Sequence, residues 1–215
     1  MNFIKYGLRK QESFAKIHYM LIFDRAREII LYPQKAWDKI KEEKNNRILI
    51  TYPLILCLIQ PIAVIIGYGI IGLWMGPAGY FRLSLVNAFF SALVAYFLSL
   101  LGIAVMGFLT LVLANYFHVE GDIFSAMKLS VYSATAPLLA GIFQIIPGLR
   151  ILMILGLYGS YILYLGIPKL MKAPHDKEPP FTFSVIIGGI ILILLINFLV
   201  SQYIFGIIYS DVLTY

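Results

Sequence analysis

Five long apolar stretches dominate this sequence and decide what it can fold into. They cover approximately residues 49–75, 84–117, 123–147, 151–170 and 181–210. A helix needs roughly 20 apolar residues to cross about 30 Å of hydrocarbon, and each stretch reaches that length. The sequence therefore predicts five membrane-spanning helices, of which the third and fourth form a hairpin joined by the tight turn at residues 147–150.

The continuity of these stretches excludes the main alternatives to a helical bundle. Membrane barrel strands alternate in polarity over segments of about 10 residues, whereas residues 190–196 are apolar throughout. A helix in lipid satisfies its own backbone hydrogen bonds. The chain is 60% hydrophobic and 13% charged, while soluble domains are roughly 45–50% and about 25%. One cysteine, Cys57, excludes a disulfide framework. We predict an all-α polytopic membrane protein.

Charge divides the chain into two regions. Residues 1–48 carry eleven Lys/Arg and six Asp/Glu, and the other 167 residues carry six and five. We interpret 1–48 as a cytoplasmic or interfacial segment without a cleavable signal peptide, and 49–210 as the membrane domain. A cytoplasmic N-terminus places fifteen of the seventeen basic residues on the cytoplasmic side and the C-terminus outside. Basic side chains facing anionic lipid explain the pI of 9.3 without a nucleic-acid partner.

The N-terminal segment carries an amphipathic pattern that a proline interrupts. Residues 17–27 mix apolar and charged side chains at helical spacing, Pro33 breaks the pattern, and residues 34–44 resume it. A tryptophan such as Trp37 on a basic helix is typical of an interfacial anchor. We expect either a membrane-surface elbow that docks a partner or a helix packed on its own bundle. The residues expected at the membrane surface or a partner are Arg27, Pro33, Lys35, Trp37, Lys39 and Ile40.

Three stretches resemble the Yip domain family, five-span membrane proteins named for interaction with Ypt/Rab GTPases. The first is residues 26–40, which read AREIILYPQKAWDKI. The second is GDIF at 121–124, continuing through Lys128 to YSATAP at 132–137. The third is the Pro147 hairpin with the tyrosine run after it. The resemblance covers about residues 20–210 and is closer to the prokaryotic branch, because the Asp-Leu-Tyr-Gly-Pro element of the eukaryotic branch is not evident. It implies a non-enzymatic role, which in eukaryotic relatives concerns vesicle trafficking.

Lys128 is the only charge well inside a predicted span. A charge at mid-bilayer costs roughly 2.5–3.5 kcal/mol on insertion scales. Lys128 lies less than two turns from the start of its span, so it could reach the cytoplasmic surface or pair with Glu120 or Asp122. Asp122 could also cap the helix. His118 joins these two acids at a spacing that converges only on an extended backbone, and no other cluster completes a ligand shell, so we predict no metal site.

Four more residues interrupt the apolar spans. Gln60 and Asn197 lie near the centres of the first and fifth spans, Pro137 interrupts the third, and Gln144 follows it. A proline removes one helix hydrogen bond and frees a carbonyl. These groups could join helices, at about 0.6 kcal/mol per contact, or line a substrate path. The candidate intramembrane polar and ion-pair residues are Gln60, Glu120, Asp122, Lys128, Tyr132, Pro137, Gln144 and Asn197.

Small residues recur at four-residue spacing along residues 126–141, which favours close helix contact and a central place for the third span. The spacing does not separate internal packing from a homo-oligomer.

Sequence motifs of common enzymes are missing, including a phosphate loop, His-Glu-x-x-His and Gly-x-Ser-x-Gly. We therefore expect no enzyme and no cofactor. The first hypothesis is a membrane-organising or adaptor protein that binds membrane or peripheral proteins through its N-terminal helices and the rim at residues 120–128. The alternative is a small oligomeric transporter or channel that uses a Lys128 pair with Gln60, Gln144 and Asn197. A third hypothesis is a lipid-handling protein such as a scramblase.

Overall fold

The structure is a computed structural model that describes residues 22–43, 46–74, 80–172 and 176–213. It confirms the all-α fold class: five helical stretches are long and apolar enough to cross a membrane. These are Arg47–Ile71, Leu85–Phe117, Ile123–Ile145, Ile151–Leu170 and Glu178–Ile204. Their bounds lie within a few residues of those predicted. The exception is the end of the fifth span, which was expected at residue 210 and lies at Ile204. The expected pattern at residues 17–21 lies outside the described residues.

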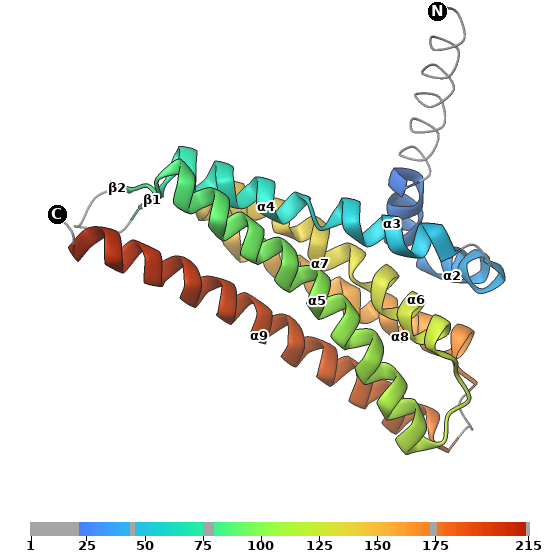
Figure 1. Cartoon of the computed structure of the whole chain (residues 1–215). Helices are drawn as coiled ribbons and strands as arrows, with labels where there is room; N and C mark the ends of the chain where they lie inside the picture. Colours follow the sequence, from blue (N-terminus) through green and yellow to red (C-terminus); the bar gives the residue numbers. More distant parts are fainter. Residues whose placement is uncertain (1–21, 44–45, 75–79, 173–175, 214–215) are drawn as a thin grey trace, which may run out of the picture.

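The helices form an elongated bundle with an elbow at one end (Figure 1). The elbow consists of the helical residues 22–31 and α2. The elements after residues 22–31 are α2 (Pro33–Glu42), α3 (Asn46–Leu56), α4 (Ile59–Val64), η1 (Ile65–Ile71), β1 (Leu73–Trp74), β2 (Tyr80–Phe81), α5 (Leu85–Phe117), α6 (Ile123–Ser133), α7 (Thr135–Ala140), η3 (Gly141–Ile145), η4 (Pro147–Leu157), α8 (Tyr158–Leu170) and α9 (Glu178–Leu213). The strands β1 and β2 form one short antiparallel pair.

Three of the spans are built from more than one kind of helix. The first changes from α-helix to the π-helix η1, and a turn at Cys57 separates α3 from α4. The third breaks at Ala134, because Pro137 has no N–H to donate to the carbonyl four residues earlier. In the second arm of the hairpin, which leads into the fourth span, the first eleven residues form the 3₁₀ helix η4. The sequence predicted the spans and the interruption of the third by Pro137, but not the changes of helix type in the first and fourth.

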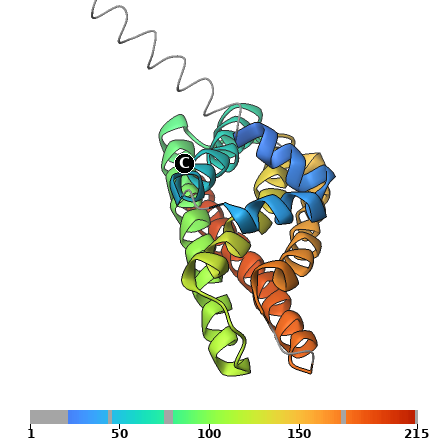
Figure 2. The same ribbon diagram turned by 90° about the vertical axis from the view of Figure 1, so that its right-hand side faces the viewer.

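The third span lies at the centre of the bundle, as its small residues predicted. In the most apolar 18-residue segment of this span, 61% of the residues are buried, compared with 11% in the corresponding segment of α9. Helix α9 runs along one edge of the bundle in Figure 1, and in Figure 2 it runs obliquely between α5 and α8. Its main neighbour is α5. With 33 residues α5 is about 50 Å long, more than a bilayer requires, so it tilts or projects beyond the hydrocarbon.

The elbow shares its core with the bundle. Buried elbow residues such as Ile22, Ile29 and Trp37 belong to the same apolar cluster as Leu129 of α6 and Ile162 of α8. Helix α2 packs along α8. The division at residue 48 rests on charge and stays a prediction.

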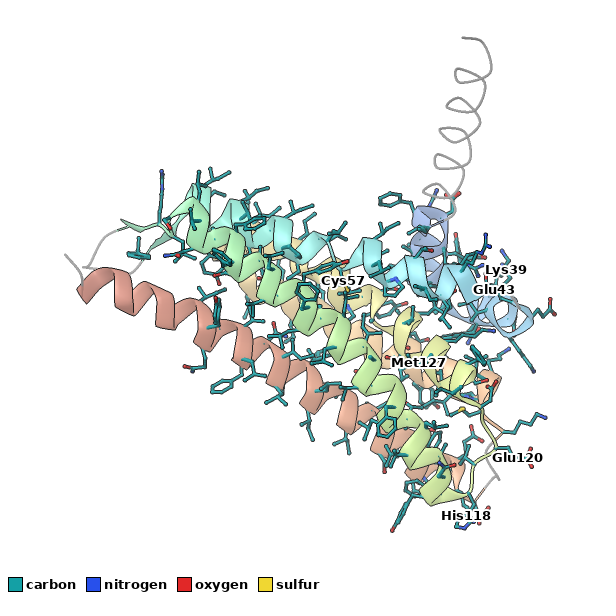
Figure 3. The ribbon with its side chains drawn as sticks, viewed as in Figure 1. Lys39, Glu43, Cys57, His118, Glu120 and Met127 are labelled. Carbon is teal, nitrogen blue, oxygen red and sulfur yellow. The ribbon has the colours of Figure 1, made fainter. Side chains whose placement is uncertain are left out.

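The two ends of the bundle differ in character. The elbow and the loops around Glu120 and Lys172 lie at one end, and the β1–β2 pair and the end of α9 lie at the other (Figure 1). Figure 3 shows Lys39 and Glu43 on the elbow side, with His118 and Glu120 at the tip of the adjoining loop. This arrangement is compatible with a chain whose termini face opposite sides of a membrane.

Candidate functional site

Trp37 fixes α2 to the membrane bundle. Its side chain is 1% exposed, and the indole Nε1 donates a 2.9 Å hydrogen bond to the carbonyl of Ile162 on α8. The ring meets that of Tyr132 edge to face, with centroids 6.3 Å apart. Ala36 and Ile40 lie on the same buried face. The apolar face of the amphipathic helix α2 therefore packs against the protein interior.

This burial corrects part of the expected surface. Trp37 and Ile40 are core residues and offer no surface to lipid or to a partner. Pro33, at the start of α2, is half-buried. Arg27, Lys35 and Lys39 are exposed. The tryptophan could not be placed from its own helix, because an indole suits an interface and a protein core equally well and its partner lies 125 residues away.

Glu43, directly after α2, holds the elbow at three points. One carboxylate oxygen accepts a 3.0 Å bond from Arg25, and the other accepts a 3.0 Å bond from the Tyr132 hydroxyl. The main-chain carbonyl of Glu43 accepts a 2.6 Å bond from the ammonium group of Lys128. These bonds join the elbow to α6 through a partly buried polar cluster.

Lys128 has partners that differ from the acidic residues considered from the sequence. Its Nζ donates to the carbonyls of Ile40, at 3.0 Å, and Glu43. The Ile40 carbonyl also accepts the N–H of Glu43 at 3.2 Å, and the Glu43 carbonyl lies just past the end of α2, so the cation sits at the C-terminal end of the helix, where positive charge is favourable. The expected pair with Glu120 or Asp122 is not formed as a hydrogen bond or a close ion pair among the described residues.

The two acids of the loop have structural partners. The Asp122 carboxylate caps α6 by accepting a 2.9 Å bond from the N–H of Ser125, as predicted. The bonds from Ser125 hold the pKa of Asp122 below its usual range. Glu120 exchanges main-chain hydrogen bonds with Lys172. Among the described residues, no three His, Cys, Asp or Glu side chains converge as a metal site would require.

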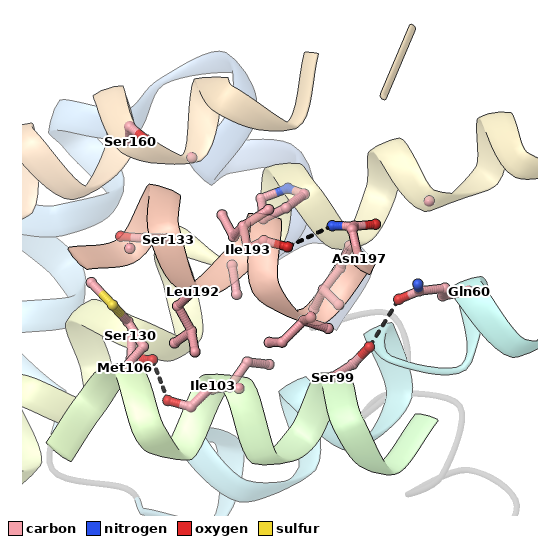
Figure 4. A pocket seen from close by; sticks show the side chains of 18 of the residues that line it. Gln60, Ser99, Ile103, Met106, Ser130, Ser133, Ser160, Leu192, Ile193 and Asn197 are labelled. Atoms are coloured by element: carbon pink, nitrogen blue, oxygen red, sulfur yellow. Dashed lines mark hydrogen bonds between the residues drawn. The ribbon is translucent and has the colours of Figure 1, made fainter. Parts of the chain in front are cut away.

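The predicted central polar residues meet at one cavity. Gln60, Pro137, Gln144 and Asn197 all line a space of about 120 Å³ between the helices (Figure 4). Tyr132 and Lys128 are not among the lining residues. The convergence depends on how each helix is rotated about its axis, which the sequence does not specify.

Four serines that the sequence did not single out as site residues also line the cavity, namely Ser99, Ser130, Ser133 and Ser160. Ser99 on α5 lies 2.8 Å from Oε1 of Gln60, and the Ser130 hydroxyl donates a 2.5 Å bond to the carbonyl of Ile103. Ser133 is buried, and its hydroxyl has no hydrogen-bond partner among the described residues. The four-residue spacing marked Ser130 and Ser133 only as small residues. Arg25 and Glu43 were also missed, because their contacts with distant residues leave no local pattern.

The fold and these sites define a multi-pass membrane protein with five spanning helices and an elbow docked on the bundle. The chain belongs to the Yip1 domain family, whose sequence model matches residues 27–196. It is 27% identical over 144 residues to the inner membrane protein YohC of Escherichia coli strain K12, covering 65% of this chain and 74% of the relative. The YohC protein of Escherichia coli O6:H1 strain CFT073 matches with the same values. No solved structure matches significantly.

Proposed function

We propose that this protein is a non-enzymatic membrane adaptor whose elbow is a preformed docking platform on the cytoplasmic face. The observation that carries the proposal is the fixed position of the elbow, which Trp37, Glu43 and Lys128 join to α8 and α6. A surface that is ordered before binding loses less conformational entropy when a partner arrives. The apolar face of α2 packs against the bundle, so its outer face is the one available to a partner.

The outer face of the elbow carries both paired and unpaired charges. Lys39 forms an ion pair with Glu28, and Lys169 of α8 forms one with Asp38. Arg27 and Lys41 are exposed and form no ion pair with another described residue. Lys35 lies over the ring of Tyr32, 5.6 Å from its centroid. Among the exposed charges of the described elbow that form no ion pair, Arg27, Lys35 and Lys41 are basic, and Asp24 and Glu42 are acidic. The balance is basic, and we propose an acidic surface of another protein as the partner.

The proposal includes an orientation. The elbow, Lys128, Lys169 and Lys172 would face the cytoplasm, and Arg82, which follows β2, would face the opposite side together with the C-terminus. This arrangement follows the positive-inside rule.

Affinity purification from native membranes in mild detergent, after brief chemical cross-linking, tests the proposal. The test variants are Arg27→Glu, Lys35→Glu and Lys41→Glu, separately and combined. Arg82→Glu is the matched control, because it reverses one basic side chain at the far end of the bundle. We expect a stoichiometric partner that the combined variant loses and the control retains.

Two results would contradict the adaptor proposal. The first is recovery of the protein alone, or only as a self-oligomer, from membranes in which the wild type is expressed at its native level. The second is a combined variant that loses binding to vesicles containing anionic lipid while its protein contacts stay unchanged. In that case the elbow would recognise the membrane surface and not a protein.

One observation favours the alternative of a transporter or channel, namely the convergence of Gln60, Gln144 and Asn197 on one cavity. The same structure places Lys128 outside the cavity and on the elbow carbonyls. The described lining contains no charged side chain. A path for a dehydrated ion is therefore poorly supported, because an ion needs compensating charges or a ring of carbonyl groups in low dielectric.

A further inference from the structure

A second cavity lies at the elbow end of the bundle, where α2, α8 and the start of α9 meet. Its volume is about 410 Å³, within the range of about 300–1,000 Å³ that is usual for small-molecule sites. Gln34 of α2 lines one side. Leu165 and Lys169 of α8 line the second, and Glu178 and Thr182 of α9 line the third. Side chains four residues apart lie on one face of a helix, so one face of α8 and one face of α9 border the same space.

The cavity carries two opposite charges that do not pair with each other. Lys169 forms its ion pair with Asp38, and Glu178 forms none with any described residue. Glu178 is nevertheless half-buried. A carboxylate that is partly removed from water is unfavourable unless a cation or a hydrogen-bond donor reaches it. Glu178 therefore favours an occupant that brings a positive charge.

Lys169 can still bind an anion on the same cavity. Its ammonium group has three N–H donors, and the bond to Asp38 uses one of them. The side chain is 40% exposed, and the bond to Asp38 holds it in place. Thr182 is 6% exposed, and its hydroxyl has no hydrogen-bond partner among the described residues. An ammonium group and a hydroxyl are both suitable donors to phosphate oxygens.

The position of the cavity along α8 and α9 matches the head-group layer of a bilayer. Directly after the cavity, α9 presents the apolar side chains of Phe183 and Ile187 on its outside. Before it, Lys172 and Asp176 are charged and exposed. Tyr164, which lines the cavity and is 54% exposed, is of the residue type that gathers where hydrocarbon meets water. The cavity thus lies where the charged surface of the elbow end gives way to an apolar one.

The two charges select among phospholipid head groups. A phosphoethanolamine head carries a phosphate and a primary ammonium group, so it supplies an anion for Lys169 and a cation for Glu178 at once. A head group with negative charge alone would be repelled by Glu178. A phosphocholine head has a quaternary ammonium group with no N–H to donate to a carboxylate, so it loses the charge-assisted hydrogen bond.

We infer that this cavity binds a phospholipid with a phosphoethanolamine head group from the leaflet on the elbow side. The phosphate lies at Lys169 and Thr182, the ammonium group lies at Glu178, and the acyl chains follow the exposed apolar side chains of α8 and α9. Free phosphoethanolamine has the same chemistry, and the experiment separates the two sources. The inference does not rest on the adaptor proposal, whose test changes none of these residues.

Photolabelling of the full chain in phosphatidylcholine nanodiscs tests the inference. Three probes carry the same diazirine near the carbonyl end of one acyl chain and differ only in a phosphoethanolamine, phosphocholine or phosphoglycerol head. Mass spectrometry maps the labelled residues. We expect the phosphoethanolamine probe to label residues 161–169 and 178–187 about tenfold more strongly than the other two, the preference expected for one charge-assisted hydrogen bond. Unlabelled phosphatidylethanolamine should compete, and free phosphoethanolamine should have no effect.

Substitutions at Glu178 separate head-group recognition from general packing. Glu178→Gln should remove the preference for the phosphoethanolamine probe over the phosphocholine probe. Glu178→Lys should transfer the preference to the phosphoglycerol probe, because two cations would then line the cavity. A gain of this kind does not arise from misfolding. Asp176→Asn is the matched control, since Asp176 is an exposed acid in the adjoining loop that does not line the cavity. It should label like the wild type.

Four results would overturn the inference. They are no labelling of the cavity wall in the wild type, equal labelling by the three probes, loss of the preference in Asp176→Asn, and competition by free phosphoethanolamine as strong as that by the lipid. The second result would show contact with lipid without recognition of the head group, and the last would identify a solute from water. The wild-type comparison of probes decides the matter even if the Glu178 variants do not fold.

Discussion

The ammonium group of Lys128 lies 2.6 Å from the main-chain carbonyl oxygen of Glu43, across 85 residues of sequence. The charge that is most costly in a membrane span is thereby used to complete the end of α2. The same residue, Glu43, receives Arg25 and Tyr132 at its carboxylate. The elbow and the central span thus form one packed unit.

The buried indole of Trp37 predicts a large effect of truncation. Trp37→Ala should lower the free energy of unfolding by about 3–5 kcal/mol. Trp37→Phe keeps most of the packing but loses the bond to Ile162, and it should cost less than Trp37→Ala. Thermal unfolding in detergent measures both, with the exposed Lys35→Ala as control. Equal stability of Trp37→Ala and wild type would show that the elbow is not docked in this way.

Gly166 of α8 leaves the space that the indole occupies. A Cβ at this position would lie 2.5 Å from Cε2 of Trp37 and 2.7 Å from Cδ2 of Leu129. Gly166→Ala should therefore loosen the elbow, at a cost of about 1–3 kcal/mol for overpacking. Protease cleavage within residues 22–43 should become faster. Gly148→Ala is the control, because nothing lies within 4 Å of a Cβ there. Similar cleavage rates for the two variants would argue against the contact.

Removal of the Lys128 ammonium should release the last turn of α2. Lys128→Met keeps much of the side-chain volume and loses both bonds to carbonyl groups, each worth about 1.5–3 kcal/mol for a charged donor. Hydrogen exchange of the amides of residues 36–43 should increase. Lys172→Met, in the neighbouring loop, provides a control with the same change of charge. Unchanged exchange in Lys128→Met would mean that these bonds contribute nothing to the elbow.

Arg25 and Glu43 should be energetically coupled. Their ion pair spans 3.0 Å, and both side chains are largely buried, so each single variant leaves one charge without its partner. In a double-mutant cycle, Arg25→Met combined with Glu43→Gln should cost less than the sum of the single changes, by about 0.5–3 kcal/mol. Chemical unfolding in mixed micelles gives the four values. Strict additivity would remove this ion pair from the account.

Asp122 predicts a small acid-dependent loss of stability. Because its pKa is lowered in the folded chain, its contribution is present above its ordinary pKa and is lost as the pH falls through the folded value. Asp122→Asn keeps a capping side chain but cannot titrate. The stability difference between wild type and Asp122→Asn should be constant from pH 7 to about 5 and should change below about pH 4. A pH-independent difference would contradict the role of the carboxylate.

Much of the fold could be predicted because it depends on local sequence. The five spans follow from apolar length, the Asp122 cap from its place before a span, and the central third span from its small residues. The break at Ala134 follows from Pro137, which interrupts the third span. The long 3₁₀ helix η4 has no comparable local signal, since η4 contains apolar residues and two glycines that suit several helix types.

The sites were less predictable because they depend on contacts over long sequence distances. For the helix of Trp37 the sequence left open a membrane surface or packing on the bundle, and the contacts with Ile162 and Tyr132 that bury the indole decide for packing. Lys128 was considered with its sequence neighbours, whereas its acceptors lie at least 85 residues away. The position of Gln60 near the centre of its span could be predicted from the sequence. Its contact with Ser99 could not, because it depends on how two helices are rotated about their axes.

Accessibility of two adjacent elbow positions tests the central claim, a docked elbow on the cytoplasmic side, most directly. In a Cys57→Ala background without other cysteines, Lys35→Cys and Ala36→Cys would be treated with a membrane-impermeant maleimide. Lys35 is exposed and Ala36 is buried. We predict rapid labelling of Lys35→Cys in inverted membrane vesicles, none in intact cells, and protection of Ala36→Cys in both. Equal labelling of the two positions, or labelling of Lys35→Cys in intact cells, would contradict the account.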